Sequence, residues 1–248
     1  MSGDASSVSR SNEPKLDSLI EDVFGLNVQG FRTLGGLFVS TKAVFESARV
    51  SDWRQKYTPT IRLTFSIITV YMLLSFFWAA EDGIFYQSLY TQIAEVRAAS
   101  ENAVTPEQIR EMVDHSFAAV SFLYPFVYMF FHGLLASCIF MWGKGTGWVT
   151  RIRLYFCLLA GGISVSLVTT MITPFLSGTM FLAFFVFSSV ATLLTYVLIY
   201  IRGMWGNASA IGLSVRGISL SILIFTLDMI VSGLTAVAAG VWASLVAA

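Results

Sequence analysis

Five long apolar runs, separated by shorter polar segments, dominate the chain. They cover about residues 63–80, 117–142, 154–172, 180–201 and 217–248. A helix needs about 20 apolar residues to cross about 30 Å of hydrocarbon, and these runs approach or exceed that length. The glycine-rich segment 143–147 and the segment 173–179, which contains Pro174, supply tight reversals between runs. The pattern predicts an all-α fold, a polytopic transmembrane helical bundle of about five spans.

The composition agrees with this pattern. Of the 248 residues 56% are hydrophobic and only 12% are charged, and the mean hydropathy is +0.73. Soluble domains carry about 25% charged residues. The formal net charge is zero, so there is no general electrostatic attraction for nucleic acid. We therefore expect the lipid bilayer, and no nucleic acid, as the surroundings of most of the chain.

The first 61 residues are too polar to cross a membrane. Residues 1–14 show no periodicity and predict a disordered tail. Residues 15–61 contain short amphipathic helical patterns that predict a cytoplasmic region lying in the membrane interface. These patterns cover Leu16–Gly25, Asn27–Phe38 and a third piece that begins at Ser40 or Thr41. Such helices either cover the cytoplasmic ends of the bundle, which we favour, or bind a partner.

Residues 62–248 form the predicted five-span domain, and its one sizeable loop, residues 81–116, is rich in Asp and Glu. Near the end of this loop, Thr105-Pro106-Glu107-Gln108 has the sequence of a capping box with proline at the first helical position. We expect that helix to continue without interruption into the second span.

Basic residues flank the spans mainly at one end of the predicted bundle. Those expected at the level of the lipid headgroups are Arg54, Lys56, Arg62, Arg153, Arg202 and Arg216. Only Arg97 and Arg110 flank the opposite end. Because basic residues stay on the cytoplasmic side, the N-terminus is expected in the cytoplasm, and the acidic loop and the C-terminus outside it. The pattern predicts a membrane protein that crosses the bilayer several times.

One carboxylate, Asp228, lies inside an apolar run. An ionised group near the centre of a bilayer costs about 2.5 kcal/mol or more, so such residues usually face other helices or a polar cavity. Counting back from the predicted helix ends places His132, the one histidine inside a span, at a similar depth. If the second and fifth spans are neighbours, the two side chains form an intramembrane polar pair able to share a proton.

Polar side chains recur at helical spacing on three spans and on the face of the fifth span that carries Asp228. The set that supports a polar path is Tyr124, Tyr128, Ser188, Thr192, Tyr196 and Ser232. One interpretation is a path lined for a proton or ion. The other is that the hydroxyl groups join the helices and that Asp228 belongs to a satisfied buried network.

The sequence contains no arrangement typical of an enzyme. His115, in the polar part, has no companion nucleophile, and no His and Glu residues have the spacing of a metal site. The two cysteines, Cys138 and Cys157, lie in apolar runs. We therefore expect no catalytic residues, no bound metal and no cofactor.

Several short motifs resemble the Yip-type five-span membrane superfamily, and within it a bacterial polytopic family without an established reaction. They are Phe31-Arg32-Thr33-Leu34, Tyr57-Thr58-Pro59-Thr60-Ile61-Arg62-Leu63 and Leu198-Ile199-Tyr200-Ile201-Arg202-Gly203-Met204-Trp205-Gly206. The resemblance implies five spans, a cytoplasmic N-terminal region and a location in a bacterial inner (plasma) membrane. The chain lacks the N-terminal cysteine-rich ribbon of many members, and has Leu158, Leu159 and Ala160 where their third span often carries histidines.

Two functions are compatible with these features. The first is a non-enzymatic membrane organiser or adaptor that binds other membrane proteins, with Asp228 paired for structural reasons. The second is a small proton- or ion-coupled transporter that uses Asp228 and His132. The lack of a visible inverted repeat favours the first, because many transporters are built from repeats.

Overall fold

The computed structural model describes residues 28–50, 53, 56–78, 84–98, 105–143, 145–176 and 178–246. Every regular element in these ranges is helical, which confirms the predicted all-α class. The elements are α2 (Val28–Val39), α3 (Thr41–Val50), α4 (Thr60–Trp78), α5 (Ile84–Ala98), α6 (Pro106–Cys138), α7 (Trp148–Thr170), the short 3₁₀ helix η1 (Thr173–Phe175), α8 (Gly178–Gly203) and α9 (Ala210–Val246).

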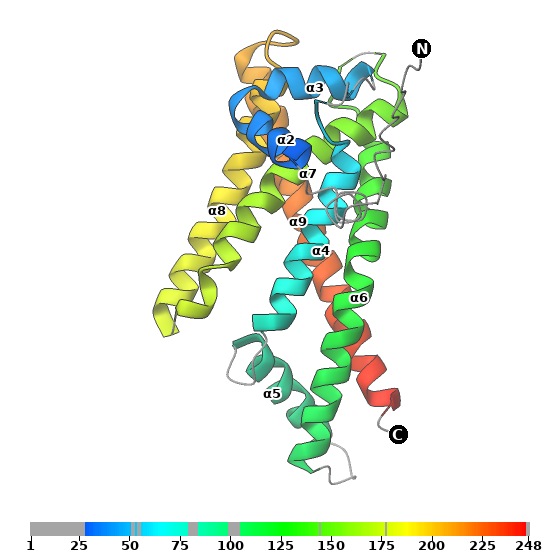
Figure 1. The fold of residues 1–248 in the computed structure, drawn as a ribbon, viewed down its shortest axis with the longest axis vertical. Coiled ribbons are helices and arrows are strands. Elements are labelled where there is room, and N and C mark those ends of the chain that lie inside the picture. The colour runs from blue at the N-terminus through cyan, green and yellow to red at the C-terminus, as the bar shows by residue number, and fades with distance from the viewer. Residues whose placement is uncertain are drawn as a thin grey trace, which may run out of the picture.

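The five longest of these helices run alternately up and down (Figure 1). Helix α6 packs on α4 and α9, α8 packs on α9, and α7 packs on α4, α6 and α8. Helices α2 and α3 lie across one end of the bundle, whereas α5 lies at the other end beside the start of α6 (Figure 1). The far ends of α7 and α8 diverge from α4, α6 and α9 (Figure 1).

Four described helices, α6, α7, α8 and α9, are long and apolar enough to cross a membrane. Helix α4 runs alongside them but provides a shorter apolar stretch, Thr60–Leu74. The predicted fifth span begins earlier than expected, at Ala210 instead of Gly217, and α9 continues unbroken past Gly233. Its 37 residues reach about 55 Å, so α9 is longer than the hydrocarbon layer is thick.

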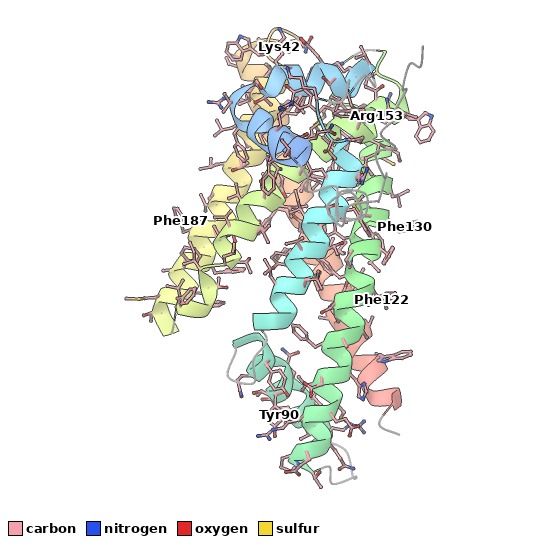
Figure 2. The ribbon with its side chains drawn as sticks, viewed as in Figure 1. Lys42, Tyr90, Phe122, Phe130, Arg153 and Phe187 are labelled. Carbon is pink, nitrogen blue, oxygen red and sulfur yellow. The ribbon has the colours of Figure 1, made fainter. Side chains whose placement is uncertain are left out.

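Large apolar side chains cover the outside of the long helices. Phe122 and Phe130 project outward from α6, and Phe187 projects from α8 on the opposite side (Figure 2). Each is more than 60% exposed. Water would not solvate such a surface favourably, whereas lipid chains would, so these faces indicate contact with the bilayer.

Helices α7 and α8 approach each other closely at two adjacent glycines. A Cβ atom on Gly161 would lie 2.1 Å from Ile199 Cδ1, and one on Gly162 would lie 2.0 Å from Tyr196 Cε1. Small residues at helix interfaces allow such close packing in membranes. This stretch of α7 is the most buried part of the chain that the structure describes.

Helices α2 and α3 are attached to the bundle by apolar packing and by several polar contacts. Leu37, Val44 and Phe45 are fully buried, and Gly203 of α8 lies directly against the Phe45 ring. Arg49 donates to the Trp142 carbonyl, Arg202 donates to the Phe38 carbonyl, and the Thr58 backbone N–H donates to Thr33 Oγ1. These helices cover one end of the bundle, as the interpretation that we favoured from the sequence requires.

The start of α6 has the predicted capping box. Gln108 N–H donates to Thr105 Oγ1, and Thr105 N–H donates to Gln108 Oε1. The helix then continues to Cys138 through Pro125, which confirms an uninterrupted connection into the second span.

The segment 81–116 is more structured than the predicted acidic loop. Helix α5 occupies much of it and packs on α6 through Tyr86, Ile93, Ile109 and Val113. The sequence analysis did not predict α5 within this loop, because the apolar spacing that α5 buries is short and lies between acidic residues. The predicted tail at 1–14 and the helix Leu16–Gly25 lie outside the described residues.

Candidate functional site

Asp228 of α9 and His132 of α6 meet inside the bundle. His132 Nε2 lies 3.0 Å from Asp228 Oδ1, and the Tyr128 hydroxyl donates to the same oxygen at 2.6 Å. The Tyr128 and His132 rings, one helical turn apart, stack with their centroids 4.0 Å apart. The His132 side chain is completely buried, whereas that of Asp228 is 19% exposed. The pair therefore consists of a buried imidazole behind a carboxylate that remains accessible.

The other ring nitrogen of His132 has a partner on a third helix. His132 Nδ1 lies 2.7 Å from the hydroxyl oxygen of Tyr155 on α7. A tyrosine hydroxyl can donate to a neutral imidazole nitrogen or accept from a protonated one. Tyr155 can therefore satisfy His132 with one proton on the ring or with two.

His132 Nε2 completes no hydrogen bond within the described residues, although Asp228 is near enough to form one. The 3.0 Å separation lies within the range of a hydrogen bond, so the two groups are close enough to interact when the charge on the pair changes.

A cavity of about 210 Å³ lies on the accessible side of Asp228, between α4, α6, α9 and the α7–α8 hairpin. Hydroxyl groups from four helices line it, among them those of Tyr71, Tyr124, Ser166, Thr170, Ser188 and Tyr196. No lysine or arginine is present among its described lining residues, and Asp228 is the one acidic residue there. The cavity therefore combines many neutral hydrogen-bonding groups with a single carboxylate.

The polar stripes predicted on the third and fourth spans bond to each other. Ser166 pairs with Thr192 at 3.0 Å, and Thr169 pairs with Ser188 at 2.6 Å. Tyr124 on α6 contacts Ser232 on α9 at 3.3 Å. The hydroxyl groups thus hold helices together, as one interpretation requires, and they also line the cavity, as the other requires.

We predict that Thr192→Val lowers the free energy of unfolding by about 0.6 kcal/mol, the average value of a hydrogen bond between membrane helices. The replacement keeps the shape of a buried side chain and removes its bond to Ser166. Thr195→Val is the matched control, because Thr195 Oγ1 bonds to Ala191 of its own helix. Unfolding in detergent by denaturant measures both, and equal losses in the two variants would contradict the assignment.

The structure also shows why the sequence analysis did not place Tyr155 in the candidate site. The predicted bounds placed it at the very start of the third span and placed His132 about ten residues from the end of the second. Helix α6 ends at Cys138 and α7 begins at Trp148, so both residues lie six or seven positions inside their helices. Correct helix ends would have revealed that they share a depth.

The depth count for Asp228 and His132 used helix ends that differ from those in the structure. Asp228 lies 18 residues inside α9, whereas His132 lies six residues from the end of α6. They meet because the first turns of α9 extend beyond the end of α6. The prediction of contact therefore depended on α6 and α9 being neighbours, and these helices pack extensively on each other.

Of the basic residues predicted at headgroup level, those that the structure describes lie at the end of the bundle that α2 and α3 cover. Figure 2 shows Arg153 and Lys42 at this end, and Tyr90 at the other. Arg62, Arg202 and Arg216 are exposed and Arg153 is half-buried. Lys56 is exposed and lies 5.1 Å from the centroid of the Tyr57 ring. Arg54 lies outside the described residues.

Comparisons with protein-family models, with curated proteins and with solved structures gave no match for this chain. The class of the protein is therefore defined by its fold and its candidate site alone. The chain is an integral membrane protein, an all-α bundle with a carboxylate–imidazole pair at the wall of a hydroxyl-lined cavity.

Proposed function

We propose that this protein is a small proton-coupled transporter in which the cavity binds a solute and the Asp228–His132 pair binds the proton. The observation that supports this most is the position of Asp228, which contacts His132 through Oδ1 and lines the cavity. Ionisable groups inside membrane bundles typically mark ion or proton paths. A role limited to helix packing would not need a cavity beside the carboxylate.

The proton chemistry follows from the bonding partners. With one proton, His132 is neutral, Tyr155 donates to Nδ1, and Nε2–H faces the Asp228 carboxylate. With a second proton, the pair becomes an imidazolium beside a carboxylate, and Nδ1–H donates to the Tyr155 oxygen. Both states keep Tyr128 donating to Asp228. The site can therefore gain or lose one proton without leaving Nδ1 or the carboxylate unpartnered.

The orientation and location belong to the same proposal. We place the N-terminus in the cytoplasm because Arg49, Arg151, Arg153, Arg202 and Arg216 all lie towards the end that carries α2 and α3. A bacterial inner membrane agrees with this arrangement and with the resemblance to a bacterial Yip-type family. In this scheme the protein catalyses no covalent reaction.

A second candidate function is the non-enzymatic organiser or adaptor. The observation that favours it is the outer side of the α2–α3 layer, where Val28, Phe31, Val39 and Val50 are 66–90% exposed. These side chains can enter the membrane interface or contact another membrane protein. Recovery of one stoichiometric membrane partner in mild detergent, lost on Phe31→Glu, would support the adaptor.

Transport is tested in vesicles that contain the purified protein and an internal pH-sensitive dye. A panel of small solutes is added outside in three charge classes: amines, neutral polyols and carboxylates. If the protein is a proton-coupled transporter, at least one class changes the internal pH faster than in protein-free vesicles. Equal responses in both kinds of vesicle for all three classes would contradict the proposal.

A further inference from the structure

The charge of the cavity restricts what it can bind. Its described lining contains one carboxylate and no basic side chain. The groups that face Asp228 are Tyr124, Tyr128 and His132 on α6, Tyr71 on α4, Tyr155 on α7 and Tyr196 on α8. Of these, only His132 becomes positively charged. The site therefore carries one negative charge when His132 is neutral, and none when the pair holds the second proton.

The two oxygens of Asp228 have different surroundings. Both contacts that the structure gives the carboxylate, from Tyr128 and from His132, are to Oδ1. The Asp228 side chain is 19% exposed and lines the cavity, so the carboxylate can be reached from it. Because Oδ1 already has two contacts, Oδ2 is the oxygen suited to accept a bond or a charge from a ligand.

The rest of the lining favours a weakly hydrated cation. Seven of the eighteen lining residues are aromatic, among them Phe181, Phe185 and Phe225. The faces of aromatic rings attract organic cations, and quaternary ammonium ligands above all. An anion would meet a carboxylate with no basic residue to compensate, and would be repelled.

The size of the cavity limits the ligand further. Its volume is about 210 Å³, and drug-sized ligands usually occupy pockets of about 300 Å³ or more. The cavity therefore favours a small ligand.

We propose that the cavity binds a small monovalent organic cation, an amine or a quaternary ammonium, in exchange for the proton held by Asp228 and His132. The proposal rests on the proposed transport function and names its substrate class and its direction of coupling. The cation's charge pairs with Asp228 Oδ2, and the proton leaves the His132–Asp228 pair for water. Each state then carries the same net charge, so the two ligands compete.

The test is calorimetric titration of the purified protein with tetramethylammonium, in two buffers of different ionisation enthalpy. Where the pair is protonated, about one proton should be released per cation bound, and the apparent Kd should fall about tenfold per pH unit as the pH rises. Tert-butanol and trimethylacetate, similar in shape but neutral and anionic, should bind at least about tenfold more weakly. These titrations use the wild-type protein, so their outcome does not depend on whether a variant folds.

Two variants assign the roles. Asp228→Asn should lose cation binding, whereas His132→Gln should keep it but release no proton at pH 7. His115→Gln is the matched control, because His115 is the other histidine of the chain and is exposed on α6. A purely structural His132 would leave the proton count unchanged.

Three results would overturn the cation proposal: equal binding of the neutral analogue, cation binding without proton release in the wild type, or unchanged binding in Asp228→Asn. The vesicle assay distinguishes an error in the proposed substrate class from an error in the proposed transport function. If polyols or carboxylates move protons and amines do not, transport stands and the cation class is wrong. If tetramethylammonium binds with proton release but no solute moves protons, the site stands and transport is wrong.

Discussion

Replacing Asp228 by asparagine is expected to lower proton-coupled solute movement by about two orders of magnitude, to the level of protein-free vesicles, while the protein still folds. The amide oxygen of asparagine can still accept from Tyr128, so the contact between α6 and α9 remains. The amide does not ionise, and it leaves His132 without an anionic partner. The free energy of unfolding should fall by only about 1 kcal/mol, the usual net value of one hydrogen bond.

The measurement combines the vesicle assay with denaturant unfolding of the same preparation in detergent. Asp114→Asn is the matched control, because Asp114 is an exposed carboxylate near the start of the same bundle helix, α6. It should leave both quantities unchanged. A folded Asp228→Asn variant with wild-type coupled movement would show that Asp228 only packs the helices.

Replacing Gly162 by valine is expected to cause the largest loss of stability, about 3 kcal/mol. The new Cβ would lie 2.0 Å from Tyr196 Cε1, and that ring is 99% buried, so it has no free space to move into. Either α7 and α8 separate or Tyr196 leaves its place beside the cavity. Because about 1 kcal/mol shifts Tm by about 2–4 °C in chains of 150–250 residues, Tm should fall by about 6–12 °C.

Gly133→Val provides the control for this experiment. Gly133 lies in the C-terminal part of α6, and no heavy atom would lie within 4 Å of an added Cβ. Valine should therefore change Tm by about 2 °C or less at this position, since surface replacements usually stay within about 0.5 kcal/mol. Similar Tm losses for both variants would mean that the close approach of α7 and α8 is not what stabilises this hairpin.

Local sequence signals predicted the helix starts and turns that depend on neighbouring residues alone. The capping box at Thr105 and Gln108 forms because its two hydrogen bonds join residues three apart. The reversal between α6 and α7 uses Gly143 and Gly145 with positive φ, a conformation that glycine adopts easily. Helix α5 was missed because its stability comes from packing on α6, which no local pattern reveals.

The candidate site could be predicted only in part. Asp228 stood out because a carboxylate in an apolar run is expensive, and His132 stood out because it is the one histidine within a span. Nothing in the sequence distinguished Tyr155, since tyrosines are common in the chain. Its role depends on its contact with His132 Nδ1, which joins α7 to α6. The cavity gave none either, because it arises where the α7–α8 hairpin diverges from the other helices (Figure 1).

By itself the sequence determined that the protein is a helical membrane bundle and that one of its helices contains a costly carboxylate. Both follow from the free energy of placing single residues and short runs in lipid, which depends on residue type and order. Only the tertiary structure decided which side chains Asp228 contacts, His132 and Tyr128 at Oδ1, and that it lines a cavity. That choice depends on the lateral packing and the relative extension of α6, α7 and α9, and these are set by close contacts between residues far apart in the chain, such as Gly162 with Tyr196.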